Sequence, residues 1–342
     1  MNKKTLYLLL PLLLAYACTK EPSSSLAVTF VTDIENAAPE MKAVIEGDNF
    51  AQANTFGLFV YHAESPNPMT VFQDYGSKYA NIMAKKDGQN WKYTLNGLTS
   101  ASASENFFLI EPSAGGSGAL AICAYAPFVD GAKSIKEIPF TIGGQHSKIT
   151  DLMWAVQNQN SSNLNIKPTG KKDETVPLTF RHALSMIRIK LKCKHAGTTM
   201  QVSSIKIRKN SGGDTPLYGS GTFNAVTGQF NGDLIETSEV VFDCKNERMT
   251  FNSETSPGIP ILIIPAEYKA DGDYEIVFEF NGQTLPTIYP IKQNDIKVEN
   301  VCKFEQGKVY NFEFVFNNYA QITGVTINTD DDWTSTSTDM EF

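Results

Sequence analysis

The chain has 342 residues, of which 42% are hydrophobic, 19% charged and 11% aromatic; this balance excludes collagen-like, coiled-coil and wholly disordered proteins. The length suits two domains. A formal net charge of −8 argues against nucleic-acid binding, which requires a cationic surface that displaces counterions from phosphates. Four histidines and five cysteines occur without C-x-x-C or H-E-x-x-H spacing, so we expect no metal and no cofactor.

The first segment is typical of a bacterial export signal. Two lysines precede an almost wholly apolar run over residues 6–17, which is too short for an ordinary membrane span. It ends in Ala-Tyr-Ala-Cys, which resembles the lipobox, in which the cysteine receives lipid and becomes the first mature residue. We predict a signal peptide over residues 1–17, a lipid such as palmitate on Cys18, and a flexible tether over residues 18–25. Plain secretion with cleavage nearby is the alternative.

Export predicts a location at the outer membrane or cell surface, where disulfides can form. Cys123 and Cys193 nevertheless lie in strand-like apolar runs, where a single cysteine usually acts as a small buried hydrophobic residue. We therefore expect no disulfide between them.

From residue 26 onward, apolar and polar residues alternate with the period of two that is typical of half-buried strands, as in the run from Tyr310 to Phe316. Asn-Gly or Asp-Gly pairs at residues 87–88, 96–97, 231–232, 271–272 and 281–282 predict left-handed turn positions. No segment keeps a helical period for more than about three turns, so helices should be few and short. Prolines around Ile259–Ile264 predict an edge strand or a strand end.

The polar segment 158–173 is the best candidate for a connection between two domains, although it could equally be a long loop within one. After it, lysine and arginine alternate with apolar residues in 187–194 and again in 205–208. Together these two strands could lay a basic stripe on an acidic protein. That stripe would be either a solvated sheet face or a docking surface for an acidic partner.

No catalytic motif stands out, and we expect no enzyme activity. His182 lies beside Arg181 and Ser185, but a catalytic triad is defined by geometry and not by adjacency, and no G-x-S-x-G elbow is present. A hydrogen-bonded structural histidine is the better interpretation. The acidic run at residues 330–332 lacks the spacing of a calcium loop.

The segment from Leu178 to Ile189, LTFRHALSMIRI, resembles the mid-chain signature of the fimbrillin family, the lipoprotein precursors of type V pili in Bacteroides-like bacteria. Other strings follow in the family's order, from about Val28 to Trp333: FGLFV at 56–60, DGQNW at 87–91, AYAP at 124–127, DLMWA at 151–155 and GKVY at 307–310. None of these strings is diagnostic alone, and their order carries the resemblance.

The resemblance implies an all-β fold of two tandem transthyretin-like β-sandwich domains. We assign residues 26–172 to the first domain, 173–333 to the second and 334–342 to a polar tail. It also implies a structural and adhesive subunit of cell-surface fimbriae. Such a subunit loses its first strand by proteolysis and is completed by a strand from another fimbrial subunit.

Leu26, Val28, Phe30 and Ile34 form the apolar face of the removable strand. Burying them would contribute roughly 1.5 to 3 kcal/mol each, so a vacated groove must be refilled. Family members cleaved by an arginine-specific protease carry Arg before the next strand, whereas this chain has Lys42 and Ala43, so cleavage after lysine, or none, must be allowed.

A shaft subunit donates its terminal strand, and here the candidate residues are Ile322, Val325 and Ile327. The polar residues that follow leave a tip, anchor or accessory subunit as plausible as a shaft one, with a host or bacterial surface receptor as a further partner. The alternative function is that of a glycan-binding surface lipoprotein for nutrient uptake. Its signature would be coplanar exposed aromatic rings, for which Trp91, Trp154 and Trp333 are the candidates.

Overall fold

The computed structural model describes residues 26–34, 55–63, 72–74, 80–87, 90–94, 108–110, 120–142, 151–156, 165–166, 174–244, 249–256, 258–298 and 300–330. Strands dominate these residues, and the one helix among them, α1 (Gln293–Ile296), has four residues. The predicted all-β class is therefore confirmed. The predicted boundary between residues 172 and 173 lies outside the described residues.

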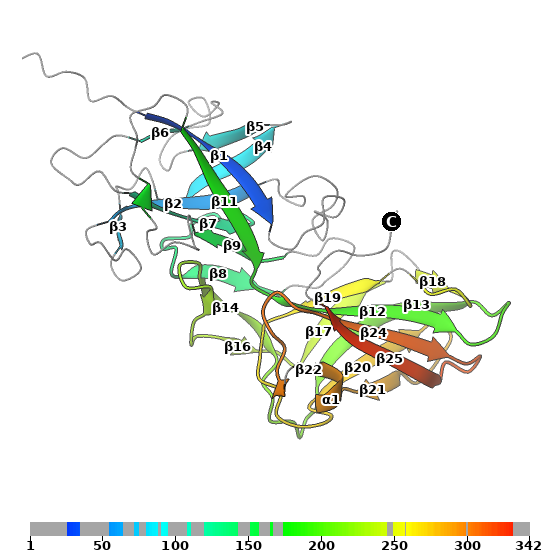
Figure 1. Ribbon diagram of the computed structural model, residues 1–342. Coiled ribbons are helices and arrows are strands. Elements are labelled where there is room, and N and C mark those ends of the chain that lie inside the picture. The colour runs from blue at the N-terminus through cyan, green and yellow to red at the C-terminus, as the bar shows by residue number, and fades with distance from the viewer. Residues whose placement is uncertain are drawn as a thin grey trace, which may run out of the picture.

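The first half of the chain forms a ten-stranded sheet, at upper left in Figure 1. Its spatial order is β5 (Asn90–Thr94), β4 (Ile82–Asp87), β2 (Thr55–Ala63), β7 (Leu120–Ala126), β9 (Met153–Val156), β11 (Glu174–His182), β1 (Leu26–Ile34) and β6 (Phe108–Ile110), while β3 (Phe72–Asp74) pairs with β2 and β10 (Asn165–Ile166) with β7.

Strand β11 joins two parts of this sheet. Its residues Glu174 to Phe180 pair in parallel with β1, and its last two residues pair with β9. The ring centroids of Phe180 on β11 and Phe56 on β2 lie 5.5 Å apart, so the β1–β11 part packs against the β2–β7 part.

The second half contains two sheets, at lower right in Figure 1. One has the order β19 (Ile259–Ile263), β12 (Ser185–Cys193), β24 (Val309–Phe316) and β25 (Ile322–Asp330). The other has the order β17 (Glu239–Asp243), β13 (Met200–Lys209), β20 (Tyr274–Phe280) and β21 (Thr287–Pro290), with β18 (Met249–Phe251) also paired to β13. A short hairpin of β22 (Lys297–Val298) and β23 (Val301–Cys302) lies apart from both.

These two sheets face each other across an aromatic core. Phe312, Phe314 and Phe316 recur at every second position of β24 and are fully buried, as the period of two requires. The ring of Phe278 on β20 lies 4.9 Å from that of Phe314 and 5.3 Å from that of Phe316 in edge-to-face arrangements. The second half is therefore a β-sandwich.

A small sheet joins the two halves. It has the order β15 (Gln229–Phe230), β14 (Tyr218–Asn224) and β16 (Ile235–Glu236), and β8 (Ile138–Thr141) from the first half pairs with β14. Trp154 of β9 packs edge-to-face on Phe223 of β14, with ring centroids 6.3 Å apart. Because strand pairing and ring packing both cross here, one apolar cluster extends through both halves.

The structure confirms some of the predicted turns and the predicted edge strand, and it contradicts one predicted turn. Gly272 and Gly282 adopt the predicted left-handed backbone, with φ of +80° and +81°, and β19 with its Pro260 is an edge strand as expected. The prediction at Asn231-Gly232 was wrong: the left-handed residue of this region is Gly228, with φ of +72°. The amide of Asn231 instead donates hydrogen bonds to the carbonyl of Lys136 and the hydroxyl of Thr222.

Candidate assembly interface

Among the described residues, strand β1 pairs only with segments that are distant from it in the sequence. Val28 to Ile34 pair in parallel with Glu174 to Phe180 of β11, and Leu26 to Val28 pair antiparallel with β6. Among the described residues no hairpin connects β1 to either neighbour (Figure 1). Backbone pairing with distant segments, and not a hairpin, therefore positions β1 in the sheet.

Strand β25 is the end strand of its sheet and pairs only with β24 among the described residues. Phe316 pairs with Ile322 and Val315 with Gly324, so Thr323 is an extra residue in the ladder. This bulge corrects the register, because Ile322 and Val325 are three residues apart and would otherwise face opposite sides. The hydroxyl of Thr323 donates to the carbonyl of Val315 at 3.1 Å.

The bulge brings the three predicted donor residues together. Ile322, Val325 and Ile327 are all partly buried and pack against the core of the second half. In contrast, Cys18, Lys42 and Ala43 lie outside the described residues. For the removable strand, Leu26, Val28, Phe30 and Ile34, the structure describes the backbone pairing of β1 alone.

His182, at the end of β11, is a structural residue as expected. Its Nδ1 lies 2.5 Å from Oδ2 of Asp151, and both side chains are buried. The neighbouring Ala183 donates its backbone N–H to the carbonyl of Leu152. These two hydrogen bonds connect the end of β11 to the segment just before β9. They lie where the chain leaves the first sheet. Sequence reasoning missed Asp151 because the two residues are 31 positions apart.

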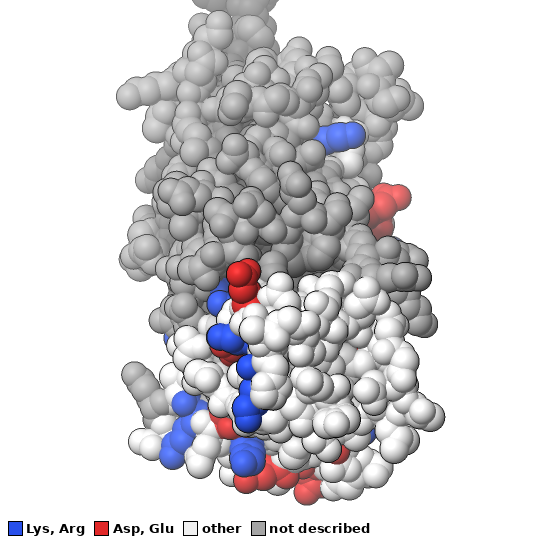
Figure 2. All heavy atoms as spheres, turned by 90° about the vertical axis from the view of Figure 1, so that its right-hand side faces the viewer, with Lys and Arg blue, Asp and Glu red and all other residues white. Residues whose placement is uncertain are grey.

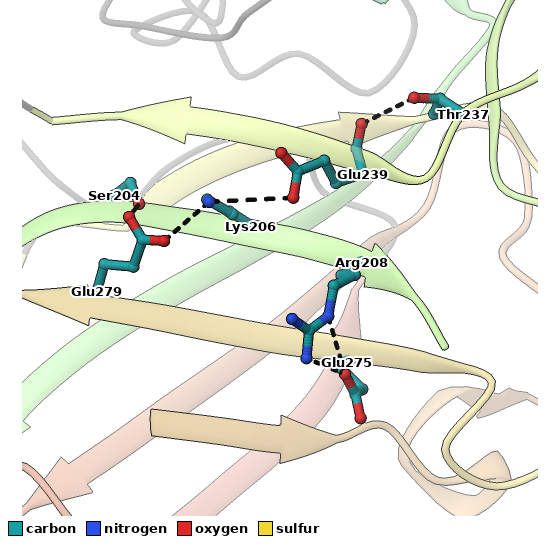
Figure 3. A network of polar contacts seen from close by, with 7 residues as sticks. All are labelled: Ser204, Lys206, Arg208, Thr237, Glu239, Glu275 and Glu279. Atoms are coloured by element: carbon teal, nitrogen blue, oxygen red, sulfur yellow. Dashed lines mark hydrogen bonds and ion pairs between the residues drawn. The ribbon is translucent and has the colours of Figure 1, made fainter. Parts of the chain in front are cut away.

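The cations of β13 lie on a sheet face where each has acidic partners (Figure 3). The ammonium group of Lys206 lies 2.8 Å from Oε1 of Glu279 on β20 and 4.0 Å from Oε2 of Glu239 on β17. The hydrogen bond to Glu279 raises the pKa of Lys206 above its usual value. Arg208 donates from Nε and Nη2 to Oε2 of Glu275, at 3.1 and 2.6 Å.

The predicted basic stripe is therefore wrong in two respects. The strands β12 and β13, which were expected to carry it side by side, belong to different sheets. The β13 cations are paired with glutamates, and on β12 Arg188 is only 5% exposed and donates to Oδ1 of Asn311. For Lys206 and Arg208 of β13, a sheet face neutralised by glutamates is the interpretation that fits.

Other candidate sites also have definite positions. Trp154 is only 7% exposed, so it cannot belong to an exposed aromatic platform for glycans; the side chains of Trp91 and Trp333 lie outside the description.

The four described cysteines are free thiols, and burial raises the pKa of Cys123 to about 12. Among described residues there is no cluster of three or more potential metal ligands. The described helix is also too short to cross a membrane.

The described residues thus form an all-β fold with long-range strand pairing and an open edge strand, β25. The chain belongs to the fimbrillin-like family, whose family model matches residues 42–333. No curated protein is similar enough to the chain to be matched with it.

Solved structures share the fold. A "putative cell adhesion protein" from Bacteroides ovatus has 17% identity and a TM-score of 0.52, over 90% of this chain and 96% of that chain. A second one, from Bacteroides uniformis, has 15% identity and a TM-score of 0.50, over 91% and 97% of the two chains. The tip fimbrial protein Mfa3 from Porphyromonas gingivalis has 6% identity and a TM-score of 0.43, over 90% and 98%.

Proposed function

We propose that this protein is a subunit of a cell-surface fimbria of the type V pilus class, exported as a lipoprotein and assembled by donor-strand exchange. A lipid on Cys18 anchors the precursor to the outer membrane. Cleavage between Lys42 and Ala43 then releases the segment that contains β1, and a strand of another fimbrial subunit takes its place. Membership of the fimbrillin-like family supports assembly with other fimbrial subunits.

The pairing of β1 carries this proposal. It is the first described strand, and its partners β11 and β6 lie more than 70 residues further along the chain. Removing β1 would expose the backbone groups of both neighbours along an open slot. Unpaired backbone groups that are shielded from water are costly, so a vacated slot favours the uptake of a new strand.

Strand β25 has the features of the donor. It is nine residues long, as is β1, and it is an end strand with one neighbour. Its apolar residues Val325 and Ile327 lie two positions apart and match the spacing of Leu26, Val28 and Phe30. Ile322 joins the same row when the bulge at Thr323 is kept. Release of β25 costs the pairing with β24 and half-buried contacts, and insertion between two strands would restore more than that loss.

The direct test is electrophoresis of the surface protein in SDS at moderate temperature. We expect a ladder of polymers, because inserted strands dissociate slowly, and a single band after boiling. Val325→Asp should abolish the ladder, since it places a charge in the apolar row of the donor strand. The matched control, Thr326→Asp, lies at the next, exposed position of β25 and should keep the ladder.

Processing is tested separately by mass spectrometry of the surface-released form. The first residue should be Ala43, and Lys42→Ala should leave an uncleaved, lipid-bearing monomer. A native surface protein that keeps Leu26–Ile34 and stays monomeric would refute the proposal. We also propose that the chain contains two transthyretin-like domains, predicted over residues 26–172 and 173–333. Because β11 (Glu174–His182) belongs to the first sheet, the division is tested by separate expression of the part that follows His182, which should give native-like circular dichroism.

A further inference from the structure

Exposed apolar side chains concentrate at one corner of the second half. Of the five large hydrophobic residues that are exposed in the described part of the chain, three lie on β21, on the turn before it, or on the β24–β25 turn: Leu285 at 79%, Ile288 at 41% and Tyr319 at 77%. We call these three residues the apolar corner. The hydroxyl of Thr287, between Leu285 and Ile288, donates at 2.6 Å to the carbonyl of Ala320, next to Tyr319.

The turn that carries Tyr319 is held rigidly. Oδ1 of Asn317 accepts the backbone N–H of Tyr319 at 2.9 Å and that of Gln321 at 3.0 Å. Thr198, in the β12–β13 loop, donates to Oδ1 of Asn318 at 3.0 Å. Ala320 has φ of +58°, a conformation that costs a residue with a Cβ roughly 1–2 kcal/mol. These hydrogen bonds already hold the turn in one conformation. Binding of a partner to the exposed Tyr319 would therefore cost little conformational entropy.

The two chain segments that form the corner carry no charge, although Lys194 lies beside them and donates its backbone N–H to the carbonyl of Phe316. Residues 280–291 and 314–329, which include β21 and nearly all of β25, contain no Asp, Glu, Lys or Arg, although 19% of the whole chain is charged. Figure 2 views the molecule from the end where these turns lie: Lys and Arg gather in a narrow column, and the broad described surface beside it is uncharged. Two copies with a net charge of −8 repel each other, so an uncharged face is where they can approach most closely.

From these observations we propose that the apolar corner is a contact between two copies of this chain, with Leu285, Ile288 and Tyr319 of one copy against the same residues of the other. Pro286 precedes β21 and Pro290 is its last residue, and neither has a backbone N–H to offer a new strand, so the contact at β21 is made by side chains and not by strand addition. Three side chains are far fewer than the roughly 20–30 residues that each partner contributes to a stable interface, so the contact is weak in solution.

A weak contact suffices where copies are held close together. On a membrane or within a polymer, the effective concentration of a neighbour reaches the order of millimolar. In this respect the biological role of the corner depends on the proposed fimbrial function, where it would join adjacent subunits beside the exchanged strand. The contact itself does not depend on strand exchange and can be measured without it.

The test is sedimentation equilibrium of residues 19–342, which lack the predicted signal peptide and Cys18, made in a host without the fimbrial protease, so that β1 stays in place and no lipid is attached. We expect reversible association with a dissociation constant of about 0.1 to 1 mM. Tyr319→Ala and Leu285→Ser should each weaken it about tenfold or more. The matched control Ile235→Ser removes an apolar side chain that is 63% exposed elsewhere, and should leave association unchanged.

Three outcomes would overturn the proposal. The chain could remain monomeric at about 1 mM, a concentration typical of tethered neighbours. Ile235→Ser could weaken association as much as the corner variants. Tyr319→Ala could leave association intact while abolishing retention on immobilised neutral oligosaccharides, which would assign the corner to a glycan. Polymers in the SDS test of the processed protein bear only on strand exchange, so the two proposals fail independently.

Discussion

At the junction between the two halves, Gly228 provides the space that the indole ring of Trp154 occupies. A Cβ atom at this position would lie 2.1 Å from Cζ2 of Trp154, and the residue has φ of +72°. Both facts require glycine, because a side chain would clash with the ring and would also strain the backbone. The position joins the turn after β14 to β9, so one glycine fixes how the first half contacts the second.

We expect Gly228→Ala to lower the free energy of unfolding by about 2 to 4 kcal/mol, from backbone strain and overpacking together. Urea denaturation followed by tryptophan fluorescence measures this loss. Gly232→Ala is the control: nothing lies within 4 Å of its future Cβ, and we expect a change within about 0.5 kcal/mol or a slight gain. Equal stabilities of the two variants would contradict this account of the junction.

Among the elements, β8 has the most unusual position. It is only four residues long and comes from the first half, yet it pairs with β14 through the register Ile138 to Phe223 and Thr141 to Ser220. The four residues of β8 alternate between buried and exposed, and Ile138 is fully buried. A strand shared in this way couples the two halves. If one half loses its packing at the junction, buried residues of the other half become exposed.

We therefore expect Ile138→Asn to destabilise both halves together, by about 3 kcal/mol or more, since it buries an amide without a partner and leaves a cavity. Hydrogen exchange should show reduced protection in β14 as well as in β8. Glu137→Gln, at the adjacent exposed position, should change neither. Loss of protection confined to β8 would show that the halves are not coupled through this strand.

For the whole molecule, buried acidic groups determine how stability depends on alkaline pH. Burial raises the pKa of the Cys123 thiol and of the Tyr310 hydroxyl to about 12, and it raises the pKa of Tyr125, Tyr268 and Tyr274 still further. In the unfolded chain these groups ionise near their ordinary values of about 8.5 for Cys and 10 for Tyr. Between those values and about pH 12 the folded state binds more protons than the unfolded state.

Stability should consequently be unaffected by these groups below about pH 8 and should fall steadily as the pH rises above 9. Urea midpoints measured from pH 7 to pH 11 test this, and the expected loss by pH 11 is several kcal/mol. Tyrosinate absorbance near 295 nm provides an internal check: the buried tyrosines should ionise only as the protein unfolds. A flat stability profile to pH 11 would contradict the burial of these groups.

The sequence alone predicts those features that depend on neighbouring residues. Period-two alternation indicates the all-β class, Asp271-Gly272 and Asn281-Gly282 predict two left-handed turns, and the prolines around Ile259–Ile264 predict an edge strand. The ordered strings from residue 56 to residue 310 indicate the fimbrillin-like family. The strand, turn and edge signals each lie within a few residues, where φ/ψ preferences and side-chain alternation act directly, whereas the family signal is the order of short strings along the chain.

Only the tertiary structure decided which strands are neighbours. Nothing local in Leu26–Ile34 indicates β11 as its parallel partner, and the similar cationic patterns of β12 and β13 gave no sign that these strands lie in different sheets. The bulge at Thr323 and the corner formed by Leu285, Ile288 and Tyr319 likewise depend on partners far along the chain. Strand pairing is chosen by backbone hydrogen bonds and packing between distant segments, and an alternating pattern constrains which face is buried but not which strand lies beside it.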